Sequence, residues 1–308
     1  MAFSATDAAF EGFRLVRRNP LALVAWALLY AVLSLASLFA LSNAIDPLIA
    51  WSERADALEA ETSPTPEALM SVMAGLGEVM MHVAWLLPVW LLVSSMLAAA
   101  VARGVLTPRA GGFGYLRLGM DELRVLGITV VLSILFIILS ILVFFGAGVI
   151  AGLASASVNT GVGVLLGVLL GLAGMALLIW LSVRLSLAVP ITVAENRFAL
   201  FDSFAVTRGR FWPLLGMAII AGVMTIIISL LSTVVTLPLG MMSGLESGWS
   251  FGSQSSDPEA IRAALDVTNP WVIASAFVEA VIYALTVGVL YAPFAAAYRD
   301  LTGKGEAQ

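Results

Sequence analysis

Glu279 is the one acidic side chain inside a long apolar segment, and it could carry proton or cation chemistry. It lies nine residues beyond Pro270, which corresponds to roughly 13 Å of helical rise. A carboxylate at that depth in a bilayer must be protonated, paired or in contact with water, because a bare charge there is costly. Two interpretations follow: a coupling site of a transporter, or a structural acid that bonds a hydroxyl such as that of Tyr283 or Ser275.

Arg184 is the second ionisable residue in an apolar segment. In IWLSVRLSLAVP, ten uncharged residues separate it from Glu195. Its side chain can extend to the membrane surface while the stem stays in the apolar layer, which is the interpretation that we favour. Alternatively, the guanidinium reaches an acid or a lipid phosphate. Glu279 and Arg184 are thus the candidate polar sites within the membrane.

Other chemistry has little support. The chain has no cysteine and one histidine, His82, so thiol catalysis and histidine pairs are excluded. Met70, Met73, Met80 and Met81 lie near His82 and offer ligands that suit Cu(I), but methionine more often fills apolar gaps. The Gly-rich stretches lack the lysine of a phosphate-binding loop, and no basic patch is interleaved with aromatic residues as in a nucleic-acid site. We predict no catalytic residues, no metal, no cofactor and no nucleic-acid partner.

The composition indicates that membrane-spanning helices carry these residues. Of 308 residues, 61% are hydrophobic and 11% charged, with a mean hydropathy of +1.03, whereas soluble domains have about 45–50% and 25%. A helix that crosses a bilayer needs about 20 apolar residues. The segments of that length are 21–42, 79–102, 125–152, 162–189, 213–240 and 270–297. We predict a single all-α polytopic membrane domain over 1–308 with six transmembrane helices.

Basic residues lie almost entirely on one side of the predicted spans. Arg54 and Arg262 flank the spans on one side, and the other thirteen of the fifteen basic residues flank them on the opposite side. By the positive-inside rule, both termini are cytoplasmic. The acidic loop 43–78 then faces outward, and Pro66 followed by Glu67 predicts a helix that starts in this loop and continues into the second span. Because arginine predominates over lysine, as in GC-rich bacterial genomes, we expect a bacterial inner-membrane protein.

Two similar stretches precede predicted spans. FEGFRLVRRN begins at Phe10 and FDSFAVTRGRFW begins at Phe201, and a shift of 191 residues places Glu11 on Asp202. Each pattern predicts a short amphipathic helix in the cytoplasmic interface, with rings among acyl chains and guanidiniums near anionic headgroups. The predicted interfacial anchors are Phe10, Phe13, Arg17, Phe201, Phe204 and Arg208.

A third, weaker copy of this pattern, FGYLRLGMDELRVL, begins at Phe113. If the three copies are related, the chain consists of the units 1–105, 106–195 and 196–308, each an interfacial helix followed by a helical hairpin. The alternative is that arginine and aromatic residues simply collect where helices cross a membrane surface.

Glycines spaced four residues apart predict close helix packing. Gly163, Gly167 and Gly171 lie on the fourth predicted span, and Gly148 and Gly152 lie on the third. Small residues at this spacing let two helices approach closely. Because the connection between these spans is short, we expect them to pack on each other. Dimerisation through this row is the alternative.

Two stretches carry a resemblance to a known family. VRLSLAVPITVAENRFALFDSFAVTRGRFWPLLG, within 181–216, and YAPFAAAYRDLTG, within 288–303, resemble the membrane domain of bacterial glycerophosphoryl diester phosphodiesterases and of related multi-pass proteins. In the phosphodiesterases this domain accompanies a soluble catalytic barrel with histidines and metal-binding carboxylates. Since this chain has a single histidine, the resemblance implies a stand-alone membrane module without that activity.

The leading functional prediction is a non-enzymatic membrane module that interacts with lipids, or with a membrane-protein partner or a second copy of itself. The alternative is a transporter or channel for a small solute, ion or lipid, with Glu279 as its coupling site. An enzyme that acts within the membrane ranks third.

Overall fold

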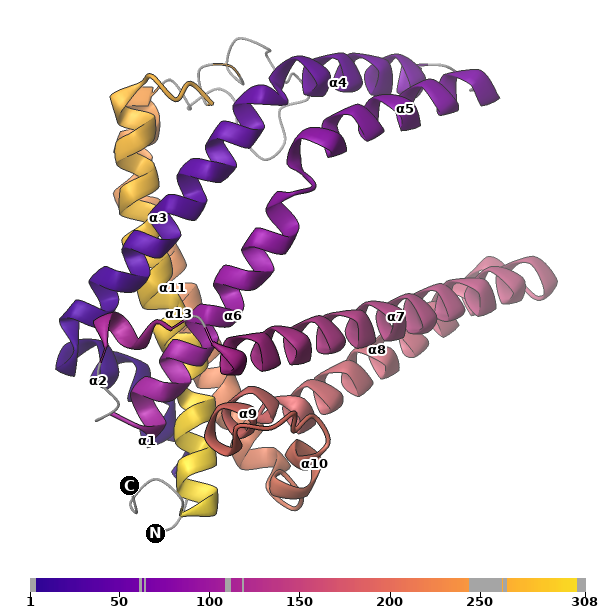
Figure 1. Ribbon diagram of the computed structural model, residues 1–308. Coiled ribbons are helices and arrows are strands. Elements are labelled where there is room, and N and C mark those ends of the chain that lie inside the picture. The colour runs from indigo at the N-terminus through magenta and orange to yellow at the C-terminus, as the bar shows by residue number, and fades with distance from the viewer. Residues whose placement is uncertain are drawn as a thin grey trace. The chain divides into compact units, whose positions relative to one another are not determined.

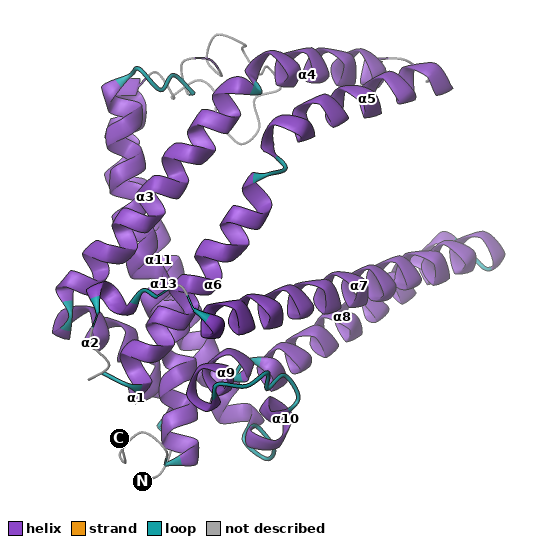
Figure 2. Cartoon of the chain, viewed as in Figure 1, coloured by secondary structure: helices purple, strands orange, loops and turns teal. Residues whose placement is uncertain are grey.

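The computed structural model describes residues 4–60, 63, 65–108, 112–117, 119–243, 262 and 265–303. Within these ranges every regular element is helical (Figure 2). Six helical stretches are long and apolar enough to cross a membrane: Pro20–Asn43, Leu86–Leu106, Met120–Ser157, Thr160–Glu195, Phe211–Met242 and Pro270–Thr302. The prediction of an all-α polytopic membrane protein is confirmed.

The chain divides into two compact units that differ in charge. Unit 1 comprises residues 1–18, 95–224 and 287–308, and unit 2 comprises 19–94 and 225–286. Within the described ranges, unit 2 contains only two arginines, Arg54 and Arg262, but most of the acidic residues. The described arginines of unit 1 are Arg14, Arg17, Arg18, Arg103, Arg117, Arg124, Arg184, Arg197, Arg208, Arg210 and Arg299.

Unit 2 contains a pair of helices, α4 (Ile45–Ala60) and α5 (Pro66–Val83), that are not among the six membrane-spanning stretches (Figure 1). Its other elements are α3 (Pro20–Asn43), the first part of α6 (Leu86–Leu106), the second part of α11 (Phe211–Ser243) and the first part of α13 (Pro270–Thr302). The predicted helix start in the loop 43–78 is confirmed, since Thr65 Oγ1 accepts a hydrogen bond from Ala68 N at 3.2 Å.

The second span begins later than predicted. Helix α5 ends at Val83, and α6 begins at Leu86, so 79–83 belong to α5 and not to the span. A turn at Ala84 and Trp85 separates the two helices, and the Trp85 indole donates to the carbonyl of His82 at 2.9 Å. The expected continuation of one helix into the other is therefore wrong: the chain bends between them.

Unit 1 is built around a long antiparallel hairpin (Figure 1). Its elements are α1 (Ala5–Ala9), α2 (Glu11–Arg18), the end of α6, the short 3₁₀ turn η1 (Phe113–Tyr115), α7 (Met120–Ser157), α8 (Thr160–Leu185), α9 (Ala188–Glu195), α10 (Asp202–Val206), the start of α11 and the end of α13. Helices α7 and α8 form the hairpin, and Asn159 Oδ1 caps α8 by accepting from Val162 N at 2.9 Å.

The hairpin packs through a glycine row that differs from the predicted one. A Cβ on Gly163 would lie 2.6 Å from Ala151 O, and one on Gly174 would overlap Val143 Cγ1. A Cβ on Gly171 would have no neighbour within 4 Å, and the same holds for Gly148 and Gly152. Gly174 follows Gly163 by eleven residues, so the two point within about 20° of the same direction on the helix. Gly171 follows Gly163 by eight residues and points about 80° away from it.

Gly167 belongs to the packing row, because its Cβ would lie 3.2 Å from Ala151 Cβ. The glycines of α8 that contact α7 are thus Gly163, Gly167 and Gly174, whereas Gly171 points away from α7. Side chains four residues apart on α7 face this row: Val143, Ala147, Ala151 and Ser155.

The expected third amphipathic helix at Phe113 is not formed. The chain makes one 3₁₀ turn there, continues non-helically through Arg117, and starts α7 only at Met120. Gly112 and Gly114 have φ values of 135° and 66°, and Tyr115 has 58°. This left-handed backbone is incompatible with a right-handed helix, so the glycines of this stretch outweigh its helix-like spacing. Leu118, which belongs to the predicted copy, lies outside the described residues.

Candidate functional site

A break between α8 and α9 brings the second predicted anchor stretch against the base of the hairpin. Ser203, on α10, is fully buried there. Its Oγ donates to the carbonyl of Arg184 at 2.6 Å and accepts from Leu187 N at 3.2 Å. One hydroxyl thus satisfies two backbone groups that the helix break would otherwise leave without partners. Thr207 Oγ1 then donates to the carbonyl of Ser203 at 2.8 Å, which closes α10.

Arg184, near the end of α8, lies at this junction. Its Nη1 donates to Thr207 Oγ1 at 3.4 Å, and its guanidinium lies 5.6 Å from the centre of the Trp180 ring. Its Nε is buried and makes no hydrogen bond. No carboxylate in the described ranges forms an ion pair with it. The helix C-terminus and the indole face therefore supply the negative potential around this cation.

Two more arginines follow Thr207 in the sequence. Arg208 and Arg210 are exposed, and Gly209 between them has φ +75°, which permits the tight turn into α11. Neither forms an ion pair with any residue that the structure describes. Beside them, Phe201 and Trp212 are about three-quarters exposed, at 76% and 77%.

Phe204 anchors this group to the core. Its half-buried ring packs against a buried cluster that includes Ile128 and Leu185, and it lies 6.3 Å from the ring of Trp180. We call the resulting group the arginine–aromatic surface. It consists of the exposed Phe201, Arg208, Arg210 and Trp212 around α10, together with Arg184 and Trp180, which contact this segment through Thr207 and Phe204.

The charge of Arg197, which is close by in the sequence, is neutralised by two carboxylates. Its guanidinium lies 2.6 Å from Glu195 Oε2 and 2.7 Å from Asp202 Oδ2. The hydrogen bond with Glu195 raises the pKa of Arg197 above its ordinary value. Glu195 also accepts from the buried Tyr298 hydroxyl at 3.2 Å. The two stretches that carry the family resemblance therefore contact each other, through α9 and the end of α13.

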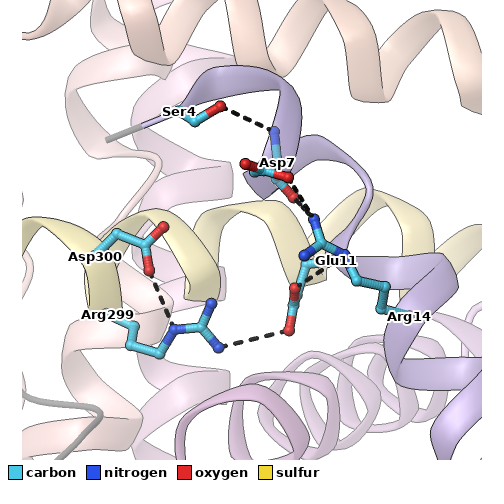
Figure 3. A network of polar contacts seen from close by, with 6 residues as sticks. All are labelled: Ser4, Asp7, Glu11, Arg14, Arg299 and Asp300. Carbon is cyan, nitrogen blue, oxygen red and sulfur yellow. Dashed lines mark hydrogen bonds and ion pairs between the residues drawn. The ribbon is translucent and has the colours of Figure 1, made fainter. Parts of the chain in front are cut away.

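The first predicted anchor stretch forms a different polar network (Figure 3). The buried carboxylate of Glu11 lies 3.5 Å from the guanidiniums of both Arg14 and Arg299. Arg14 also reaches Asp7 Oδ1 at 3.3 Å, and Arg299 reaches Asp300 Oδ1 at 3.2 Å. These contacts hold the N-terminal helix α2 beside the end of α13, so the two terminal segments lie side by side.

The predicted anchors of the first stretch are Phe10, just before α2, and Phe13 and Arg17 on it, and they are partly exposed. Phe10 and Arg17 are exposed, whereas Phe13 is half-buried and its ring lies 6.4 Å from that of Phe10. Glu11 and Asp202, which the shift of 191 residues aligns, lie in different environments. The side chain of Glu11 is 8% exposed, and that of Asp202 is 42% exposed. The repeated pattern thus corresponds to two short helices with different polar partners.

A second buried charge pair lies at the start of α7 and was not predicted. Arg103, near the end of α6, donates to the carboxylate of Glu122 and, at 2.6 Å, to the carbonyl of Tyr115. Glu122 Oε2 also accepts from Gly119 N at 2.9 Å, so it caps α7. This contact explains how Tyr115 is held in its left-handed conformation. A Glu three residues after a glycine at a helix start was the only sequence signal for it.

Glu279 lies in the part of α13 that belongs to unit 2. Its side chain is exposed in the protein, and it forms no ion pair with any described residue. The Ser275 hydroxyl donates to the carbonyl of Val272 at 2.8 Å. It lies close enough to Tyr30 for an electrostatic interaction with the phenol. The rings of Tyr30 and Tyr283 are stacked, with centroids 3.8 Å apart. The sequence singled out Glu279 and named Tyr283 as a possible partner, but it did not indicate Tyr30.

The fold and these sites define an α-helical integral membrane protein. The chain belongs to the family described as DUF7847, a domain of unknown function, whose model matches residues 5–301. No curated protein and no solved structure matches it.

Proposed function

We propose that this DUF7847 protein is a non-enzymatic lipid-binding module of the bacterial inner membrane, and that its arginine–aromatic surface binds anionic headgroups from the cytoplasmic side. The observation that carries the proposal is the group of three arginines, Arg184, Arg208 and Arg210, that have no acidic partner in the described ranges. Arg197 is the useful contrast, since it lies close in sequence and has two carboxylate partners.

The chemistry of this surface suits a phospholipid. Guanidinium groups form paired hydrogen bonds with phosphate oxygens. Exposed tryptophan and phenylalanine rings favour the boundary between acyl chains and headgroups, where one side of the ring is apolar and the other is wet. The positive-inside pattern predicts that these arginines face the leaflet that carries most negative surface potential in a cell. The resemblance to the membrane domain of phosphodiesterases that act on glycerophosphoryl compounds supports the same conclusion.

The double substitution Arg208→Gln/Arg210→Gln tests this function. Each basic side chain near an anionic surface contributes about 1 kcal/mol, so removing two should lower the preference for anionic lipid by roughly tenfold or more. The protein is reconstituted in nanodiscs that mix phosphatidylglycerol with phosphatidylcholine, and spin-labelled forms of each lipid report their association. Arg54→Gln is the matched control, because Arg54 lies on α4 with Glu78 3.9 Å away. An unchanged preference in the double variant, or an equal loss in the control, contradicts the proposal.

A second candidate function, transport of protons or cations, rests on Glu279. An acid inside a span that has no basic counter-charge among the described residues is a functional candidate in its own right. If Glu279 couples transport, proteoliposomes under a membrane potential should show a flux that Glu279→Gln abolishes and Glu78→Gln leaves intact. A pH-sensitive dye inside the vesicles measures it. Equal flux through wild type and Glu279→Gln removes the transporter hypothesis.

A further inference from the structure

Helix α5 carries a continuous exposed apolar stripe. At about 100° per residue, Leu69, Met70, Met73, Met80 and Met81 fall within an arc of about 120° on its surface. All five side chains are exposed, with Met70 at 71% and Met81 at 75%. We call these five residues the methionine stripe. So much exposed apolar surface on one helix face indicates that something covers it.

The remaining surface of α5 consists of two further faces, one buried and one polar. Gly75 and Val79 are buried, and a Cβ on Gly75 would lie 2.5 Å from Arg54 Nη1 and 3.4 Å from Trp51 Cδ1, so this face packs on α4. A third face is polar and exposed. It consists of Glu67, Ser71, Glu78 and His82. The helix therefore has one face for α4, one for water and one apolar face that no described residue of unit 2 buries.

Helix α4 has no exposed apolar face like the methionine stripe of α5. Its exposed residues include Asp46, Glu53, Asp56 and Glu59, and none of its large apolar side chains is exposed. The α4–α5 pair (Figure 1) is thus amphipathic as a whole: the acids of α4 require water, and the methionine stripe of α5 requires an apolar medium.

The chain connections tie this pair to the membrane surface. Only Ala44 separates the end of α3 from α4, and only Ala84 and Trp85 separate α5 from α6. Both α3 and α6 are membrane spans. At the α6 end, Leu87 and Trp90 are exposed on the span, and Trp85 and Met81, just before it, are exposed as well. The stripe is therefore followed along the chain by the exposed apolar side chains of a helix long and apolar enough to cross a membrane.

We infer that α5 is an interfacial helix that inserts its methionine stripe into the leaflet at which α3 ends and α6 begins. The ligand is the acyl-chain and glycerol region of the phospholipids of that leaflet. The carboxylates of α4 give this pair no attraction for anionic lipids, so apolar area drives the contact. This site is separate from the arginine–aromatic surface and does not depend on the lipid selectivity proposed for it.

Single cysteines can test this site without background, because the chain has none. The variants Met70→Cys, Met73→Cys and Met81→Cys are labelled with an environment-sensitive NBD fluorophore, and Ser71→Cys and His82→Cys on the polar face are the matched controls. In phosphatidylcholine nanodiscs, the labels on the stripe should emit at shorter wavelength than the controls. Phospholipids with a doxyl group near the glycerol should quench them several-fold more strongly, and iodide in the water should quench them less.

Adding a charge to the stripe provides a second measurement. Met73→Glu should reduce lipid quenching of the label at position 81 several-fold, whereas Ser71→Glu should leave it unchanged, and circular dichroism checks that both variants keep their helices. Iodide quenching that is equal on both faces overturns the inference. So does a stripe that lipids do not quench but that becomes shielded as protein concentration rises, because a second copy would then cover it. Shielding that appears only with another protein present overturns it in the same way.

Discussion

Glu122→Ala should lower the free energy of unfolding by about 3–5 kcal/mol, because it leaves the guanidinium of Arg103 buried without a counter-charge. The side chains of this pair are 8% and 2% exposed, so water cannot replace the lost carboxylate. The substitution also removes the acceptor for Gly119 N at the start of α7 and weakens the contact that holds Tyr115. Loss of this single side chain should therefore affect α6, α7 and the turn between them.

Thermal and denaturant unfolding in detergent, followed by tryptophan fluorescence, measure the effect. Asp121→Asn is the matched control. Asp121 pairs with Arg124 at 2.7 Å, but both side chains are about one-third exposed, and such pairs contribute about 0–1 kcal/mol. The double variant Arg103→Met/Glu122→Leu should recover much of the lost stability, because replacing both charges removes the buried cation as well. A Glu122→Ala protein that unfolds like Asp121→Asn would show that the pair is hydrated.

The spans were predictable from the sequence because their signal is local. A run of about 20 apolar residues has few alternatives in a bilayer, and six such runs correspond to six helices here. The helix start at Pro66 was equally local, since a threonine followed by proline and glutamate supplies its own cap. At Phe113 the helix-like spacing of aromatic residues and arginines was misleading. The predicted helix is absent there because Gly112 and Gly114 adopt left-handed backbone.

Partnerships between distant residues could not be predicted in the same way. The sequence shift singled out Glu11, but nothing in it indicates that Arg299, at the other end of the chain, provides the counter-charge. Likewise, Arg184 was recognised as a candidate, whereas the contribution of Ser203 and Thr207 depends on how α10 folds back on α8. The glycine row could be predicted only in part. The spacing of four residues identified α8 as a closely packed helix, but the rotation of α8 about its axis determines that Gly174, and not Gly171, contacts α7.

Gly12→Ala should have the second largest effect, because α2 and α13 approach there backbone to backbone. A Cβ on Gly12 would lie 2.5 Å from Val289 Cα and 2.6 Å from Gly288 O. Backbone atoms of a helix cannot rotate away as a side-chain tip can, so α2 must move as a body. Overpacking of this kind costs about 1–3 kcal/mol. The movement also separates Glu11 from Arg299, whose 3.5 Å contact depends on the same approach (Figure 3).

Gly216→Ala is the matched control for this prediction, because Gly216 lies in α11 and a Cβ there would have no neighbour within 4 Å. A glycine in a helix interior destabilises it by roughly 0.5–1 kcal/mol relative to alanine, so this control should melt at or above the wild-type temperature. Gly12→Ala should melt several degrees below it, and limited proteolysis should cleave before α3 more rapidly. If Gly12→Ala instead gains stability as Gly216→Ala does, α2 is not held against Gly288 and Val289. In that case the contact of Glu11 with Arg299 cannot be what holds the two terminal segments together.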